Sequence, residues 1–131
     1  MSATIRAIRL DIDGTLTHLE LPTGDALVPA LREHVGGFVE IAHYARTTDG
    51  SRRLSVAMDA DGGLLQPENL YVTSLISAIR LKQLPYAIHG PVVLLGALGD
   101  AGEHTEVPAP LRENLQRIVD ALKTRYAPAS S

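Results

Sequence analysis

The sequence contains no cysteine and no tryptophan, and only one of its 131 residues is phenylalanine. Without thiols, neither a disulfide framework nor a thiolate–metal site can form. No apolar run approaches the roughly 20 residues that a membrane helix needs, and no signal-peptide stretch precedes the first acidic residues. The formal charge of −3 disfavours a nucleic-acid binder that works by bulk positive charge. We therefore expect a cytoplasmic protein without a membrane or nucleic-acid partner.

The composition that remains is that of an ordinary globular domain. Hydrophobic residues make up 45% of the chain and charged residues 21%, and the length suits one core rather than two. The only low-complexity stretch is Ala127-Pro128-Ala129-Ser130-Ser131. We expect a single α+β domain over residues 1–125 and a disordered tail over residues 126–131.

The segment with the most distinctive local motif is Asp11-Ile12-Asp13-Gly14-Thr15, which follows an apolar run. It resembles the first motif of the haloacid-dehalogenase-type phosphatases. That resemblance implies a phosphohydrolase in which Asp11 is the nucleophile, Asp13 is the general acid/base, and both help to hold Mg²⁺. Proteins of that family have a doubly wound parallel sheet, and their chains are usually longer than this one.

The residues after Gly14 favour a different structure at the same place. They alternate with period two, and Asp13-Gly14 is a strong signal for a two-residue hairpin turn. Such a turn places Ile12 opposite Thr15 and keeps the two aspartates out of a buried Mg²⁺ pocket, so we favour it over the phosphatase. One face of the hairpin then collects Ile8, Leu10, Ile12, Leu19 and Leu21, and the other collects Arg9, Asp11, His18 and Glu20.

A second hairpin is expected over residues 38–59, with its turn at Asp49-Gly50. This pairing puts His43 opposite Val56 on an apolar face, where we expect a hydrogen-bonded core histidine, and puts Tyr44 on the other face. The tip of the hairpin carries positive charge that could bind an anion or an acidic partner. Its basic residues are Arg46, Arg52 and Arg53.

The remaining elements follow from helical spacing and from breaker residues. A short helix is expected before Gly36-Gly37, and a second helix from Pro67 to about Lys82, where Asn69 near the start could present its amide to a ligand. The run Val92–Leu95 predicts a central strand buried on both faces, and a last helix starts near Pro110. The order is ββαββαβα, which predicts an α+β fold: a mixed, mostly antiparallel sheet with helices packed on one side.

Several of these segments together resemble a known family. They are Leu10-Asp11-Ile12-Asp13-Gly14, Val35-Gly36-Gly37-Phe38-Val39-Glu40, Pro67-Glu68-Asn69, and the stretch from Ile88 to Gly96. In this order they are similar to domain-of-unknown-function family 3846, which comprises small proteins of phages and actinobacterial genomes. The resemblance implies a small stand-alone domain of the kind often carried by phages or mobile elements, and it implies no catalytic mechanism.

The function that we expect is therefore that of a small non-enzymatic binding or modulator protein, encoded by a phage or a mobile element. Its partner would be a protein or a small anionic ligand, with no cofactor or metal, and exposed hairpin edges suit a homodimer. The alternative is the Mg²⁺-dependent phosphohydrolase that uses Asp11 and Asp13. The expected binding residues are Arg46, Arg52, Arg53, Tyr44 and Asn69.

Overall fold

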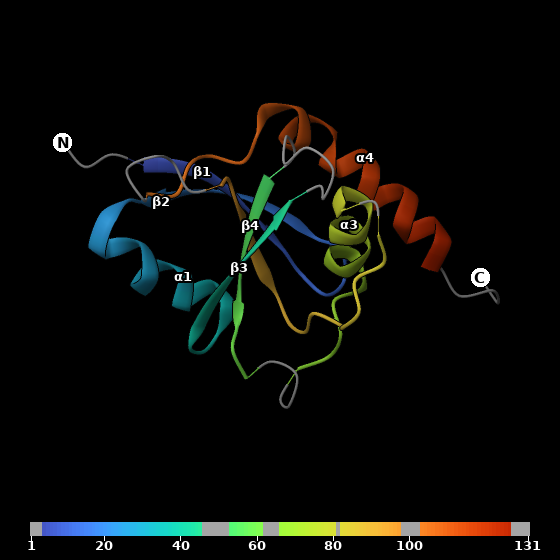
Figure 1. Ribbon diagram of the computed structural model, residues 1–131, viewed down its shortest axis with the longest axis horizontal. Helices are drawn as coiled ribbons and strands as arrows, with labels where there is room; N and C mark the ends of the chain where they lie inside the picture. The colour runs from blue at the N-terminus through green and yellow to red at the C-terminus, as the bar shows by residue number, and fades with distance from the viewer. Residues whose placement is uncertain (1–3, 46–52, 62–65, 81, 98–102, 127–131) are drawn as a thin grey trace.

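The computed structural model describes residues 4–45, 53–61, 66–80, 82–97 and 103–126 (Figure 1). The elements follow one another as predicted, in the order ββαββαβα. They are β1 (Thr4–Leu10), β2 (Leu16–Pro22), a single 3-10 turn η1 (Gly24–Ala26), α1 (Leu27–Val35), β3 (Val39–Ala45), β4 (Arg53–Asp59), α3 (Leu70–Arg80), β5 (Val92–Leu95) and α4 (Ala109–Tyr126). Of the predicted tail, Tyr126 is the last residue of α4, and residues 127–131 lie outside the described residues.

The five strands form one sheet in the order β2-β1-β5-β4-β3. Every pairing among these strands is antiparallel, so the α+β prediction is confirmed. The last strand in the chain, β5, lies at the centre of the sheet, and all four of its side chains are fully buried. The prediction of a central strand that is covered on both faces is therefore also confirmed.

The helices lie on both faces of the sheet, and the prediction that they pack on one side was wrong. Figure 1 shows α1 on one side and α3 with α4 on the other. The core is accordingly divided in two: Leu27, Leu31 and Val35 of α1 pack on one face, and the helices α3 and α4 pack on the other. The physical reason is that the inner strands are apolar at successive positions, so both faces of the sheet must be covered.

The first hairpin forms as predicted, but through a longer loop. Leu10 pairs with Leu16, and residues 11–15 connect the strands. The N–H of Gly14 donates to the carbonyl of Asp11 at 3.0 Å, and the N–H of Asp11 donates to the carbonyl of Thr15 at 3.0 Å. Gly14 has φ +86°, which is the left-handed residue of a three-residue hairpin loop.

This loop shifts the predicted register by one residue, and the shift changes the faces. Ile8 lies opposite His18 rather than Leu19. Leu19 and Leu21 consequently pack on the α1 face with Ala7, while Ile8 and Leu10 pack on the other face. The prediction that all of these apolar side chains share one side was therefore wrong, because a one-residue slip moves a whole strand's side chains to the other face.

The second hairpin shows the same one-residue difference. His43 pairs with Ser55, and Tyr44 pairs with Leu54. Tyr44 is therefore buried in the core on the α3 side, and His43 is exposed, so the prediction of a core histidine was wrong. The predicted turn at Asp49-Gly50 lies outside the described residues.

A fully buried asparagine joins three elements. The side-chain amide of Asn69 donates to the carbonyl of Leu10 at 3.0 Å and to the carbonyl of Gly90 at 3.0 Å. Its side-chain oxygen accepts from the N–H of Val72 at 3.2 Å, in the first turn of α3. One side chain thus connects the end of β1, the residues before β5 and the start of α3, where it satisfies a free helix N–H.

The Gly36-Gly37 pair has two separate structural roles. Gly36 has φ +84° and ends α1, and its N–H donates to the carbonyl of Arg32. A Cβ on Gly37 would lie 2.6 Å from the carboxylate of Asp59. That buried carboxylate accepts hydrogen bonds from the N–H of Asp61 and from the side chain of Gln66, so it has little room to move away.

We predict that Asn69→Ala lowers the free energy of unfolding by about 3 kcal/mol, because it leaves two buried carbonyls and one helix N–H without partners. Asn69→Asp should be no less damaging, because a carboxylate cannot donate to either carbonyl. Urea denaturation of the purified variants measures both effects.

The matched control is Asn114→Ala, since the side chain of Asn114 also donates to a backbone carbonyl, but on the exposed surface of α4. This change should stay within about 0.5 kcal/mol of the parent protein. Equal losses for Asn69→Ala and Asn114→Ala would contradict the structural role of Asn69.

Candidate functional site: a basic hollow beside the first strand pair

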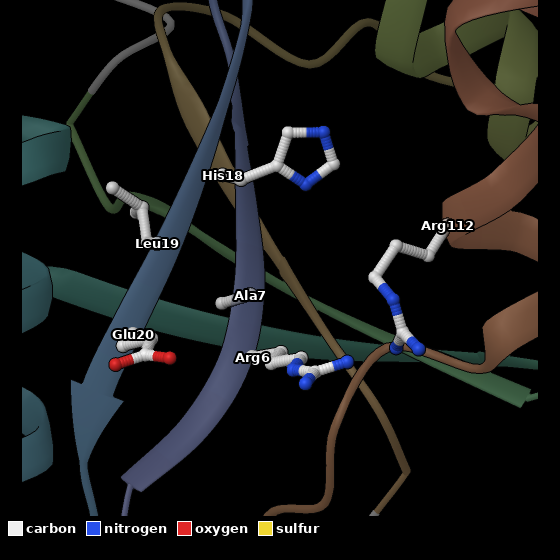
Figure 2. A pocket seen from close by; sticks show the side chains of 6 residues that line it. All are labelled: Arg6, Ala7, His18, Leu19, Glu20 and Arg112. Carbon is white, nitrogen blue, oxygen red and sulfur yellow. The ribbon is translucent and has the colours of Figure 1, made fainter.

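An open hollow of about 540 Å³ lies where α4 passes the β1–β2 pair. Figure 2 shows the His18 ring of β2 and the guanidinium groups of Arg6, from β1, and Arg112, from α4, reaching into the same space. Glu20 stands at the β2 side of the hollow, and Ala7 and Leu19 complete its lining. Three basic side chains from three elements therefore meet around one cavity.

The register of the first hairpin places the strand residues of this hollow. Arg6 pairs with Glu20, and Ile8 pairs with His18. Side chains alternate along a strand, so Arg6, His18 and Glu20 share the face on which α3 and α4 pack. In the register predicted from the sequence, His18 and Glu20 would instead have accompanied Arg9 and Asp11.

The segment before α4 holds the third basic residue in place. The N–H of Val107 donates to the carbonyl of Arg6 at 3.2 Å, and the carbonyl of Val107 accepts from Nη1 of Arg112 at 2.8 Å. Val107 itself is buried. Arg112 is thus tied to the strand that carries Arg6, and the remaining guanidinium N–H groups of both residues are available to a ligand.

The positive charges of the hollow are not neutralised by the protein. Among the described residues, the one ion pair within 4 Å joins Arg9 to Asp11. Although Glu20 lies directly opposite Arg6 in the sheet, no ion pair within 4 Å joins its carboxylate to Arg6 or Arg112. The hollow is therefore a locally cationic place in a chain whose formal charge is −3.

The five binding residues predicted from the sequence are not brought together by the described part of the chain. Arg46 and Arg52 lie outside the described residues, and Arg53 is placed only as the backbone partner of Ala45. Tyr44 is buried, and its hydroxyl is hydrogen-bonded to that of Tyr86. Asn69 is enclosed and uses its amide within the fold, so it has no side-chain donor left for a ligand.

The two aspartates of the phosphatase-like motif have local partners. Nε and Nη2 of Arg9 donate to Oδ1 of Asp11 at 3.1 and 2.9 Å. Oδ1 of Asp13 accepts from the N–H of Thr15 at 2.9 Å. A hydrogen bond with the Thr15 side chain, followed by this backbone hydrogen bond, lowers the pKa of Asp13. Both neighbours of β1 are antiparallel, unlike the parallel sheet of the phosphatases, so the geometry lends that alternative no support.

No group of three or more histidine, aspartate or glutamate side chains is arranged to hold a metal ion within the described ranges. No helix in the described part of the chain is both long enough and apolar enough to cross a membrane.

Comparison with known proteins does not identify the chain. No family model matches it, and neither a curated protein nor a solved structure shows significant similarity to it.

Sequence reasoning missed Arg6 and Arg112 as site residues. Arg112 follows Pro110 at the start of a helix, a position where a charged side chain is ordinary. The missing information was the path of residues 103–107, which pair with Gly96 and Ala97 and then with Arg6. A pattern of local spacing cannot show that this segment returns to the first strand.

One histidine on that returning segment is sensitive to pH. Burial is the main cause that lowers the pKa of His104 below its ordinary 6.5; the nearby His43 acts in the same direction, and a backbone hydrogen bond with Gly96 opposes it. The two imidazole rings stack with their centroids 5.9 Å apart. Nδ1 of His104 is buried without a hydrogen-bond partner among the described residues, so the folded protein favours the neutral ring.

We predict that His104 makes the folded protein less stable as the pH falls below 6.5. On acidification the His104 ring is protonated in the unfolded chain at a higher pH than in the folded chain. The free energy of unfolding therefore begins to fall near pH 6.5, and the loss is complete below the lowered pKa of the folded state. Urea denaturation over this range should show that His104→Gln loses less stability on acidification than the parent protein does. Parallel pH profiles for the two proteins would refute this role, and His18→Gln, at an exposed ring, is the matched control.

Proposed function

We propose that this protein is a non-enzymatic binding module for a small anionic ligand. The ligand's phosphate-like oxyanion would lie between Arg6, His18 and Arg112. The observation that carries the proposal is that three basic side chains converge on one hollow without an ion-pair partner in the described part of the chain.

The chemistry of the three side chains favours an oxyanion. A guanidinium group presents a planar fork of N–H donors that matches two oxygens of a phosphate or a carboxylate. Two such forks from different elements can bind different oxygens of one group, as a tetrahedral phosphate allows. His18 supplies a further donor, and protonation of its ring would add a third positive charge.

The size of the hollow suits a small molecule. Its volume of about 540 Å³ falls within the roughly 300–1,000 Å³ of ordinary ligand pockets. Ala7 and Leu19 also line the hollow, but their side chains pack on the α1 face, so they present backbone to a ligand. A phosphorylated metabolite of nucleotide size therefore fits the site better than a bare ion does.

The small-ligand form of the proposal has more support than the protein-partner form. Arg6 and Arg112 line a hollow rather than a flat surface, and Arg112 is fixed by its bond to Val107. A site that is held in place before binding loses less conformational freedom when a small ligand enters.

The test is isothermal titration calorimetry of the full chain at low ionic strength, with pyrophosphate and adenosine 5′-monophosphate as probes. We predict binding of at least one probe, and a loss of about tenfold or more in affinity for each of Arg6→Gln and Arg112→Gln, because each change removes a charge-assisted hydrogen-bonding group. The same ligand should raise the melting temperature of the parent protein by mass action.

Arg117→Gln is the matched control, because Arg117 is an exposed arginine of the same helix and does not line the hollow. It should bind the probe as the parent protein does. The proposal fails if neither probe binds at millimolar concentration, or if Arg117→Gln weakens binding as much as Arg6→Gln and Arg112→Gln do.

Three broader proposals rest on the sequence. The resemblance to domain-of-unknown-function family 3846, and the phage or mobile-element origin that it implies, are proposed on the quoted segments. A cytoplasmic location is proposed on the composition. A homodimer is proposed because β2 and β3 are the edge strands of the sheet and edge strands can pair with a second chain.

A further inference from the structure

A second hollow, of about 330 Å³, lies at the opposite edge of the sheet from the basic hollow. It is formed where the end of α3 meets β3 and the segment that follows the helix. Its lining residues are His43, Tyr44, Arg80, Leu84, Pro85 and Tyr86.

A pair of tyrosines forms one wall of this hollow. The hydroxyl oxygens of Tyr44 and Tyr86 are 2.7 Å apart and hydrogen-bonded. Tyr44 is buried, whereas 51% of Tyr86 is exposed. Burial, followed by the hydrogen bond to Tyr86, raises the pKa of Tyr44. The hydrogen bond between the two hydroxyls holds the Tyr86 ring in place as an exposed aromatic surface.

Arg80, which has a guanidinium N–H group without an acceptor in the described part of the chain, lies beside the tyrosines. Nη1 of Arg80 is shut off from solvent and has no acceptor among the described residues. Arg80 lines the hollow together with Tyr44 and Tyr86, which places its side chain beside the tyrosine pair. A guanidinium N–H that is removed from water without an acceptor costs free energy, and the positive charge of the same guanidinium attracts a carboxylate to the hollow.

Leu84 and Pro85 form an apolar part of the wall, on a segment that is held in position by α3. The N–H of Leu84 donates to Oγ of Ser77 at 3.0 Å, and the N–H of Ile88 donates to Oγ1 of Thr73 at 3.2 Å. Leu84, Pro85 and Tyr86 therefore sit on a segment that two helix side chains tie down. The hollow is formed before any ligand arrives.

From these observations we propose that the second hollow binds a small aromatic monocarboxylate, with its carboxylate on Arg80 and its ring against Tyr86 and Pro85. A single guanidinium matches a single carboxylate. Glu40 lies on the same face of β3 as Tyr44, and its carboxylate would repel a dianion more strongly than a monoanion. The ring of Tyr86 favours an aromatic body, which can stack or pack edge to face.

The experiment is a titration of the ¹⁵N-labelled full chain with benzoate, followed by two-dimensional NMR, with benzyl alcohol as the uncharged probe of the same shape. Benzoate should shift the backbone signals of Tyr44, Arg80 and Tyr86. Benzyl alcohol should bind about tenfold more weakly or worse, since it lacks the charged acceptor.

Two variants test the two halves of the site. Arg80→Gln should weaken benzoate about tenfold and bring its affinity close to that of benzyl alcohol. Tyr86→Ala changes a half-exposed residue, so it should fold, and it should weaken both probes together. If Arg80→Gln does not fold, Arg80→Lys keeps the charge without the planar fork and should bind benzoate more weakly than the parent protein does.

Arg117→Gln is the matched control, because Arg117 is an exposed arginine that lines neither hollow, and it should leave benzoate binding unchanged. The inference is overturned if benzoate shifts no signals around Tyr44, Arg80 and Tyr86, or if benzoate and benzyl alcohol bind there equally. It is also overturned if Arg80→Gln retains full affinity. None of these outcomes depends on whether the basic hollow binds a phosphate.

Discussion

The fold depends on one buried amide, because the side chain of Asn69 makes hydrogen bonds to three separate parts of the chain. Its side-chain NH2 group donates to the carbonyl of Leu10 at the end of β1 and to the carbonyl of Gly90 before β5. Its side-chain oxygen accepts from the N–H of Val72 and so caps α3. The backbone N–H of Asn69 also donates to the carbonyl of Ile88 at 2.7 Å. The direction of α3 and the path that returns to β5 are therefore fixed together, and with them the position of Arg80 at the end of that helix. A buried polar group this well satisfied specifies one arrangement of the core.

The order of the elements could be predicted from the sequence, because it depends on local signals. Gly36 ends α1 in the left-handed conformation, and the apolar run of β5 needs cover on both faces. The registers could not be predicted, since period two says that faces alternate without saying which residues oppose one another. In β1 the difficulty is acute: Ala7 is buried on one face and Ile8 on the other. The hydrophobicity of the side chains therefore could not exclude the wrong pairing of the two strands. That pairing treats Ile12 as a strand residue, whereas Ile12 lies in the loop and is 40% exposed.

The same limit explains why the residues of the basic hollow could not be found from the sequence. The Asp11-Ile12-Asp13 motif and the arginines near the second turn are conspicuous because they lie close together in the sequence. Arg6 and Arg112 come from opposite ends of the chain, and only the hydrogen bonds of Val107 bring them to one hollow. His18 was noticed as part of a polar patch, yet the register error gave it the wrong neighbours. Local spacing predicts elements well, whereas a binding site that is assembled by tertiary structure leaves little trace in local spacing.

The positions of the two hollows follow from how the sheet is covered. All four side chains of the central strand β5 are buried in the core, so none of them can contact a ligand at the surface. The edge strands β2 and β3 each have one neighbour and carry exposed polar residues among their apolar ones. Each hollow forms where an edge pair meets the end of a helix, with Arg112 near the start of α4 and Arg80 at the end of α3. In a chain with a net negative charge, the convergence of Arg6, His18 and Arg112 on one hollow gives an anion a local place to bind. A surface ion pair adds little to stability, and Arg6 forms none with the opposing Glu20, so its guanidinium remains available to such an anion.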